Sequence, residues 1–213
     1  MNMSKILYIT SNPKSVEQSY SLTVGEAFLE EYKKLNPNDE IINLDLYKTY
    51  VPYIDEDVFN AWGKLSQGTD FNSLSEEEKK KVSGIDKLTD QFIDADKYVF
   101  VTPLWNFGFP PIMKAYIDTI CIAKKTFKYT ENGPVGLLHG RKALHIQASG
   151  SVFSEGDYSQ FEHGNSHMKT ILNFVGITDI ETILVEGIAQ MPDKAEEIKN
   201  NSILKAKEVA SRF

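Results

Sequence analysis

The 213-residue chain is poor in the features that mark secreted, membrane-spanning and nucleic-acid-binding proteins. It has one cysteine, Cys121, so no disulfide can form within the chain, and a cytoplasmic location fits best. No segment approaches the roughly 20 apolar residues of a membrane helix, and the opening residues MNMSK run into a strand without a signal-peptide pattern. Because the formal net charge is −7, we expect neither a nucleic acid nor a membrane as a partner.

Motifs of several ligand and catalytic sites are also absent. The chain has neither a G-x-x-x-x-G-K-[ST] loop nor a G-x-G-x-x-G turn, which argues against a nucleoside triphosphate site and a dinucleotide-binding Rossmann site. It has no G-x-S-x-G elbow, which argues against an α/β-hydrolase. His163 and His167 are four residues apart, but no third ligand lies at metal-binding spacing, so we expect no metal site.

What the sequence does have is an alternation of short apolar runs with longer helical patterns. Hydrophobic residues make up 41% of the chain, enough for a globular core. The patterns predict strands at 5–10, 40–46, 97–103, 141–149 and 180–188. They predict helices at 17–35, 73–95, 110–124, 158–175 and 192–212. This alternation indicates an α/β fold, a flavodoxin-like doubly wound parallel sheet of five strands in the order 2-1-3-4-5 with helices on both faces.

Residues 52–72 interrupt the alternation, and we interpret them as an insertion that covers one edge of the fold. The chain shows no internal repeat, no low-complexity tract and no second domain boundary. The sequence therefore predicts a single domain over residues 1–213.

In open α/β sheets, ligands bind beyond the carboxyl ends of the strands, near the point where the strand order reverses. This rule points to the loops at 11–19, 103–110 and 148–157. The first loop offers the hydroxyls of Ser11, Ser15 and Ser19, and backbone N–H groups at the start of a helix can hold an anion. On this loop alone, ordinary turn and N-cap roles are the stronger interpretation.

The second loop carries three aromatic residues at a strand exit, Trp105, Phe107 and Phe109. Prolines stiffen it at positions 103, 110 and 111, because proline fixes φ. With the amide of Asn106, this combination suits a planar, hydrogen-bonding ligand such as an isoalloxazine ring, although a core role is common for such clusters. The third loop is small and rich in glycine and serine, and it fits either a pyrimidine-like edge or a plain connection.

Four segments, distributed from residue 18 to residue 198, carry a resemblance to a known family that covers essentially the whole chain. They are PLWNFGFPPIMKAYID (103–118), KTFKYTENGPVGLLHGRKA (125–143), QSYS (18–21) and VEGIAQMPDKAEEI (185–198). The sequence resembles the FMN-dependent NADH:azoreductases and NADH:quinone oxidoreductases, which are related to quinone reductases of the DT-diaphorase type. The block from 103 to 143 is the most specific part of this resemblance.

The resemblance implies three groups of residues around an FMN. The phosphate and ribityl chain would lie at Ser11, Glu17, Gln18 and Ser19. The isoalloxazine would lie at Leu104, Trp105, Asn106 and Phe107. Its pyrimidine edge would lie at Ala148, Ser149, Gly150 and Ser151, where relatives often have Arg-Gly-Gly after the first residue. Here the three residues after Ala148 are Ser-Gly-Ser, so one glycine of that motif is kept and the arginine is absent.

The resemblance also implies the reaction. NADH would reduce the flavin, and a quinone or azo compound would then take two electrons in the same pocket, which is a ping-pong mechanism without a catalytic side chain. A homodimer would share this pocket, with Phe107, Tyr129 and Phe174 around it, although a core role for Phe174 is an equal alternative. A flavodoxin-like electron carrier without its own substrate is the competing function, and the segments 52–95 and 125–137 argue against it.

Overall fold

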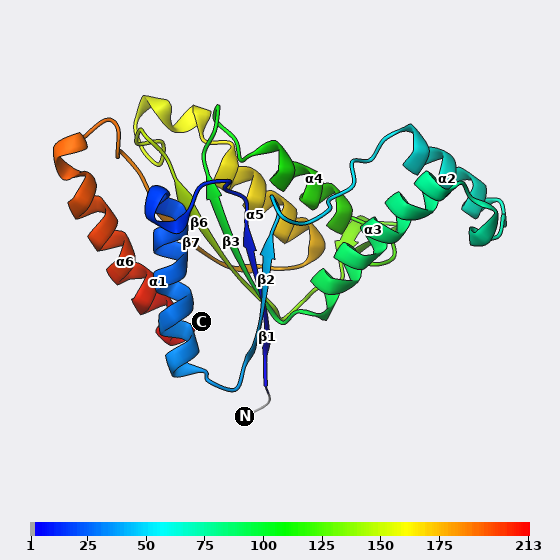
Figure 1. The fold of residues 1–213 in the computed structure, drawn as a ribbon, viewed down its shortest axis with the longest axis horizontal. Coiled ribbons are helices and arrows are strands. Elements are labelled where there is room, and N and C mark those ends of the chain that lie inside the picture. The colour runs from blue at the N-terminus through cyan, green and yellow to red at the C-terminus, as the bar shows by residue number, and fades with distance from the viewer. Residues whose placement is uncertain (1–2) are drawn as a thin grey trace.

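The computed structural model describes residues 3–213 and contains one five-stranded parallel sheet, seen edge-on at the centre of Figure 1. Its strands are β1 (Lys5–Thr10), β2 (Glu40–Asp45), β3 (Lys97–Pro103), β6 (Lys142–Ala148) and β7 (Asp179–Val185). Their order is β2-β1-β3-β6-β7. Numbered along the main sheet alone, this is the predicted order 2-1-3-4-5, so the predicted fold class is confirmed.

Helices cover both faces of this sheet. Helices α1 (Tyr20–Leu35) and α6 (Ala195–Arg212) lie side by side on one face (Figure 1). Helices α3 (Glu76–Asp94), α4 (Pro111–Ile120) and α5 (Gly164–Val175) pack on the other. Alternate residues of each central strand belong to the two resulting cores, with Val99 and Val101 on one side and Tyr98 and Phe100 on the other. Burial on both faces explains why the central strands read as continuous apolar runs.

The segment predicted as an irregular insertion, 52–72, contains a helix that the sequence prediction missed. This helix, α2 (Glu56–Ser66), begins after Asp55, whose side chain accepts a hydrogen bond from the N–H of Val58. Together with the short turn η2 (Phe71–Ser73) it lies at the outer end of α3 (Figure 1). A small apolar cluster of Ala61, Leu74 and Val82 joins α2 to α3. The insertion is therefore an ordered extension of α3.

Four predicted helices, α1, α3, α5 and α6, begin three or more residues later than expected, because each is preceded by a short 3₁₀ turn. The turns are η1 (Val16–Gln18), η2, η3 (Asp157–Phe161) and η4 (Pro192–Lys194). The largest difference is at α5, predicted from 158 and observed from Gly164. There the carboxylate of Glu162 accepts hydrogen bonds from the N–H groups of Asn165 and Ser166, at 2.7 and 2.9 Å, and fixes the helix start.

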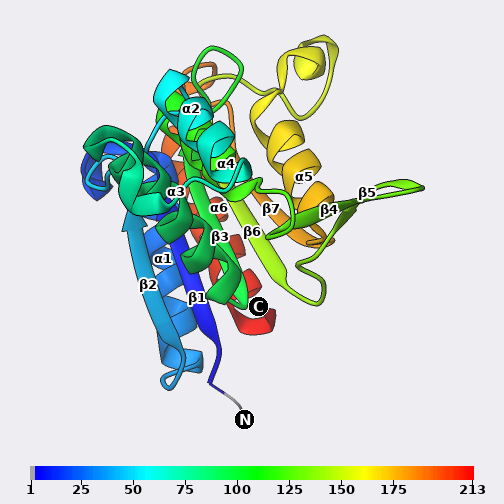
Figure 2. The ribbon, with the colours of Figure 1, turned by 90° about the vertical axis from the view of Figure 1, so that its right-hand side faces the viewer.

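A hairpin of β4 (Phe127–Thr130) and β5 (Gly133–Gly136) projects from the body of the molecule (Figure 2). Its base is docked tightly, because a Cβ on Gly136 would come within 2.2 Å of the backbone nitrogen of Gly176. Phe127 is buried at this base, whereas Tyr129 is 74% exposed. Within residues 3–213, no helix has both the length and the apolar character needed to cross a membrane.

Candidate functional site

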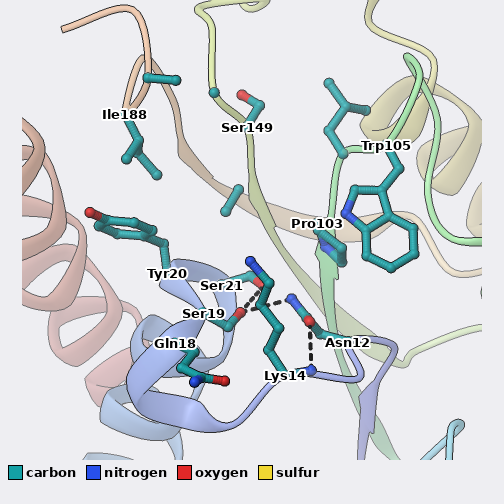
Figure 3. A pocket seen from close by; sticks show the side chains of 14 residues that line it. Asn12, Lys14, Gln18, Ser19, Tyr20, Ser21, Pro103, Trp105, Ser149 and Ile188 are labelled. Carbon is teal, nitrogen blue, oxygen red and sulfur yellow. Dashed lines mark hydrogen bonds between the residues drawn. The ribbon is translucent and has the colours of Figure 1, made fainter. Parts of the chain in front are cut away.

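A pocket of about 280 Å³ opens at the carboxyl edge of the sheet, where the strand order reverses between β1 and β3. Figure 3 shows its walls, with the loop after β1 on one side and Trp105 facing Tyr20 and Ile188 across the opening. The lining residues are Asn12, Lys14, Gln18, Ser19, Tyr20, Ser21, Pro103, Leu104, Trp105, Ala148, Ser149, Gly150, Ile188 and Ala189. The pocket thus joins the three loops that the sequence singled out.

One end of the pocket is the start of α1. Ser19 is the N-cap, and its buried Oγ accepts hydrogen bonds from the N–H of Leu22 at 3.3 Å and from Nδ2 of Asn12 at 2.8 Å. The hydroxyl of Ser21 lies 3.2 Å from the same oxygen. The N–H groups of Tyr20 and Ser21 have no acceptor among residues 3–213. Free N–H groups and hydroxyls at a helix N-terminus suit an anion such as a phosphate.

Ser11 adds an unpaired donor beneath this end. Its side chain is fully buried, and its Oγ has no hydrogen-bond partner among the described residues, although its backbone N–H reaches the carbonyl of Val101. A buried hydroxyl without a partner is costly, so a bound acceptor would relieve it. Of the residues predicted here, Gln18 and Ser19 line the pocket, whereas the fully buried Ser11 and the exposed Glu17 do not. A hydrogen bond from Ser15 lowers the pKa of the Glu17 carboxyl below its ordinary value.

The other end of the pocket is a tight turn, residues 105–108, of which only Trp105 lines the pocket; the predicted ring contacts Asn106 and Phe107 do not. The N–H of Trp105 donates to the carbonyl of Gly108 at 2.6 Å, and the N–H of Gly108 donates back at 3.0 Å. Asn106 and Phe107 between them have φ of 47° and 70°, the left-handed pairing of a type I′ turn. A bulky residue at positive φ is strained. The turn holds the rings of Trp105 and Phe107 partly in solvent, 39% and 46% exposed.

The loop after β6 closes the pocket between the two ends. The N–H of Leu104 donates to the carbonyl of Ala148 at 2.7 Å, which ties this loop to the tight turn. The carbonyl of Gly150 accepts from the N–H groups of Ala189 and Gln190, at 2.8 and 2.9 Å. Ser151 does not line the pocket, but its carbonyl accepts from the hydroxyl of Ser149. Among residues 3–213, the N–H groups of Gly150 and Ser151 have no acceptor and are available to a ligand.

Aromatic side chains from the segment 149–163 pack on the tight turn. The ring of Phe107 lies 6.0 Å from that of Phe153 and 5.1 Å from that of Phe161, measured between ring centres. The N–H of His163 donates to the carbonyl of Phe107 at 2.9 Å. Phe107 is therefore the contact through which this segment rests on the pocket entrance.

Below the turn, a buried polar network fixes the ends of β3 and β6. Nε2 of His145 lies 2.9 Å from Oγ1 of Thr102, and Nδ1 lies 3.1 Å from Oδ1 of Asn165. Burial lowers the pKa of His145 to about 4, so its ring is neutral at pH 7. Gln147 is also buried and donates to the carboxylate of Glu162 at 3.0 Å. The network joins the sheet to the start of α5.

Of the three residues predicted around the acceptor, Phe107 stands on the turn at the entrance without lining the pocket, and Tyr129 and Phe174 lie outside the pocket of this chain. Tyr129 is on the projecting hairpin, and its ring contacts Phe127. Phe174 is half-buried on α5, with its ring 4.6 Å from that of Phe127. Both residues therefore belong to the hairpin and its base in the single chain.

Several lining residues were missed as site residues in the sequence analysis, namely Asn12, Lys14, Tyr20, Ser21, Pro103, Ile188 and Ala189. Ile188 and Ala189 follow β7, the fourth strand end at this edge, so the same rule that selected three loops could have selected a fourth. Within residues 3–213, no cluster of three His, Cys, Asp or Glu side chains could hold a metal ion.

The donors at one end, the aromatic turn at the other and the free N–H groups between them fit a phosphate ester carried on a flat heteroaromatic ring. FMN has this constitution. A dinucleotide flavin would need a second phosphate subsite, and the loop after β1 has none of the glycine patterns that provide one.

Comparison with known proteins agrees with this assignment. Residues 4–209 match a family model described as a flavodoxin-like fold. The chain is 56% identical to an FMN-dependent NADH:quinone oxidoreductase of Geobacillus kaustophilus and 54% identical to FMN-dependent NADH:quinone oxidoreductase 2 of Bacillus subtilis. Each alignment covers 99% of this chain and 100% of the relative.

Solved structures give the same result. An azoreductase of Bacillus anthracis superposes with a TM-score of 0.92 at 43% identity, covering 99% of this chain and 100% of the other. An FMN-dependent NADH-azoreductase of the same species, in complex with FMN, superposes with a TM-score of 0.93 at 40% identity over 99% of each chain. Fold, pocket and relatives together place this chain in the family of FMN-dependent NADH:quinone oxidoreductases and azoreductases, within the flavodoxin-like fold.

Proposed function

We propose that this protein is a cytoplasmic, single-domain, FMN-dependent oxidoreductase that uses NADH to reduce quinones by two electrons and to cleave azo compounds. One observation carries the proposal: a single pocket joins a helix N-terminus with free N–H groups to the indole of Trp105, which a tight turn presents at the other end. A simple phosphate site needs only the first end, and a simple apolar site needs only the second. The names of the relatives supply the reaction.

When bound, FMN supplies the redox chemistry, accepting a hydride from NADH and passing two electrons to the acceptor. The chain supplies binding, orientation and exclusion of water. Gln18 and Ser19 line the pocket and would hold the phosphate and the ribityl chain, and the unpaired hydroxyl of Ser11, next to Asn12 in the chain, would be a further donor. Glu17, whose side chain is exposed and outside the pocket, could contribute only through its backbone. Leu104 and Trp105 line the pocket and would wall the ring, with Asn106 and Phe107 meeting it from the rest of the turn.

The loop after β6 would meet the polar edge of the ring. Gly150 and Ser151 offer free N–H groups there, and preorganised N–H donors stabilise negative charge that develops on a bound ring. Ala148 and Ser149 complete this wall. No arginine is needed for this role, because backbone N–H groups take its place. The reaction needs no acid or base from the protein, and we assign no catalytic side chain.

Donor and acceptor would use one pocket in turn, which gives ping-pong kinetics. The test is steady-state oxidation of NADH with a quinone and an azo dye at known FMN content and with no other reductase added. We expect parallel double-reciprocal lines. Intersecting lines would contradict the shared pocket, and a lack of turnover with FMN bound would favour an electron carrier.

We further propose a homodimer in which Tyr129 acts at the neighbouring subunit's pocket. Its ring is 74% exposed on a hairpin that projects from the body, while the hairpin base is held against α5. Phe174 supports this base through Phe127. An aromatic side chain presented in this way has an unused face for a partner subunit.

The dimer proposal predicts a specific kinetic defect. Tyr129→Ala should raise the KM for the acceptor roughly 3- to 10-fold, as expected for loss of one aromatic contact, with normal FMN content. Leu204→Ala, which removes an exposed apolar side chain from α6, is the control. Mixed with chains disabled at Asn106, Tyr129→Ala chains should recover one intact site per heterodimer. An active monomer in light scattering, or no recovery after verified subunit exchange, would reject the shared site.

A further inference from the structure

Lys14 is the one charged side chain among the fourteen residues that line the pocket. It comes from the loop between β1 and η1, and its side chain extends into the pocket on the side lined by Ser19 and Ser21 (Figure 3). Its ammonium group has no ion pair and no hydrogen bond within residues 3–213, whereas its backbone N–H is fixed to Oδ1 of Asn12 at 3.1 Å. The charge is therefore free for a ligand, on a backbone that is held in place.

The surroundings make this charge distinctive. The next basic residue along the chain is Lys33, at the far end of α1. The nearest acidic residue in sequence, Glu17, is exposed and outside the pocket. The local arrangement therefore places a positive charge inside and a negative charge outside, in a protein of net charge −7.

We propose that Lys14 is the counter-charge of the FMN phosphate and the residue that makes this chain select FMN over riboflavin; this inference rests on the function proposed above. A phosphate monoester carries about −1.5 to −2 charges at pH 7. The N–H groups of Tyr20 and Ser21 and the hydroxyl of Ser19 supply directed hydrogen bonds but no net charge. Because the protein has a net charge of −7, its overall field repels an anionic ligand, and Lys14 supplies the local positive charge that attracts the phosphate.

The test compares two flavins that differ only in the phosphate. Flavin-free wild-type protein and Lys14→Met, which keeps an unbranched apolar stem, are titrated with FMN and with riboflavin by fluorescence quenching. We expect the Kd for FMN to rise roughly 10- to 100-fold in Lys14→Met, the range for a lost charge-assisted hydrogen bond. The Kd for riboflavin should change less than about 2-fold, since no phosphate is present to lose its partner.

Two controls sharpen the result. Lys14→Arg should retain most of the preference for FMN, and Lys33→Met should bind both flavins as wild type does, because Lys33 lies outside the pocket. Raising NaCl from about 50 to about 500 mM should weaken FMN binding to wild type more than to Lys14→Met, because salt screens the charge pair.

The outcomes separate this inference from the proposed function. Unchanged FMN affinity in Lys14→Met, or an equal loss for FMN and riboflavin, would overturn the role of Lys14 while leaving the flavoprotein intact. Failure of the wild type to bind either flavin would overturn both.

Discussion

The two ends of the pocket are built in opposite ways. The phosphate end uses ordinary elements, a helix start with a serine N-cap, and none of its residues from 11 to 21 has a positive φ. The ring end depends on a tight turn in which Asn106 and Phe107 both have positive φ. Within residues 3–213, only one other non-glycine residue, Lys124, does so.

This difference shows how one pocket divides two tasks. A helix N-terminus presents free N–H groups at no extra conformational cost, so phosphate recognition is compatible with stability. Holding two aromatic rings at a water-exposed entrance is not compatible with stability in the same way, because the two residues with positive φ cost about 1–3 kcal/mol of strain each. Substitutions at the phosphate end should therefore alter the affinity for FMN. Substitutions in the turn at the ring end should lower turnover while relieving strain and so raising stability.

The strongest test of this division is Ser19→Asp. The new carboxylate can still accept the hydrogen bond from Leu22, so the cap of α1 and the free energy of unfolding should be nearly unchanged. It would lie beside the phosphate, and like charges in a partly desolvated site should weaken FMN binding roughly 10- to 100-fold or more. Flavin titration and urea unfolding measure the two quantities.

Ser15→Asp is the matched control, because Ser15 is exposed and its side chain makes no cap hydrogen bond. Ser19→Asp protein that binds FMN like wild type would show that the start of α1 is only a capped helix. If Ser19→Asp lowered both FMN affinity and the free energy of unfolding, the phosphate end would not be separable from the stability of the fold.

Glu162→Gln tests the anchor of the ring end. The carboxylate accepts hydrogen bonds from Gln147 and from the N–H groups of Asn165 and Ser166. Loss of its charge should cost about 1–2 kcal/mol of unfolding free energy at pH 7 and loosen the segment that rests on Phe107. The acceptor kcat/KM should fall with little change in FMN affinity.

The same variant has a signature in pH. Burial alone would raise the pKa of Glu162, but hydrogen bonds, the one from Gln147 foremost, lower it overall. The native state thus binds fewer protons than the unfolded state, so this stabilisation is present above the ordinary value of about 4.3 and is lost as pH falls through the lower native value. Between pH 7 and pH 3, the free energy of unfolding in urea should fall less in Glu162→Gln than in wild type or in the exposed control Glu155→Gln.

The smallest expected effect concerns strain itself. Phe107→Gly and Phe107→Ala both remove the ring, but glycine accepts a φ of 70° and alanine does not. Phe107→Gly should therefore be more stable than Phe107→Ala by about 1 kcal/mol in urea unfolding, while both lose acceptor turnover. Equal stability of the two variants would show that the turn stores no strain.

Much of the fold could be predicted because its signals are local. Strands such as 97–103 are continuous apolar runs, and the helical pattern predicted over 73–95 is α3, which begins three residues later at Glu76. The predicted start of α5 at 158 was wrong because residues 157–161 form a 3₁₀ turn. The helix itself begins where the Glu162 carboxylate, held by Gln147 of β6, accepts hydrogen bonds from the N–H groups of residues 165 and 166. The helix α2 was missed although Asp55 and the spacing of Val58, Ala61, Trp62 and Leu65 indicate it.

The same distinction between local signals and contacts made by the fold applies to the site. Residue types indicated where a phosphate and a ring could bind, since serines and aromatics stand at strand exits. The positive φ of Phe107 could not be predicted, because phenylalanine has no preference for that conformation. The hydrogen bonds between Trp105 and Gly108 close the turn, and contacts of Phe107 with residues 153, 161 and 163 hold it there. The direction of the Lys14 side chain likewise depends on the loop that carries it.

The sequence distance between the pocket walls has a consequence for biosynthesis. Tyr20 lines one side and Ile188 and Ala189 line another, so the pocket is incomplete until the wall after β7 has been synthesised. The docking of α6 against α1 requires residues further along the chain still. We therefore expect the nascent chain to begin folding without help from flavin and to acquire it only once this wall has formed. Under riboflavin starvation, cells should accumulate folded apoprotein rather than aggregates.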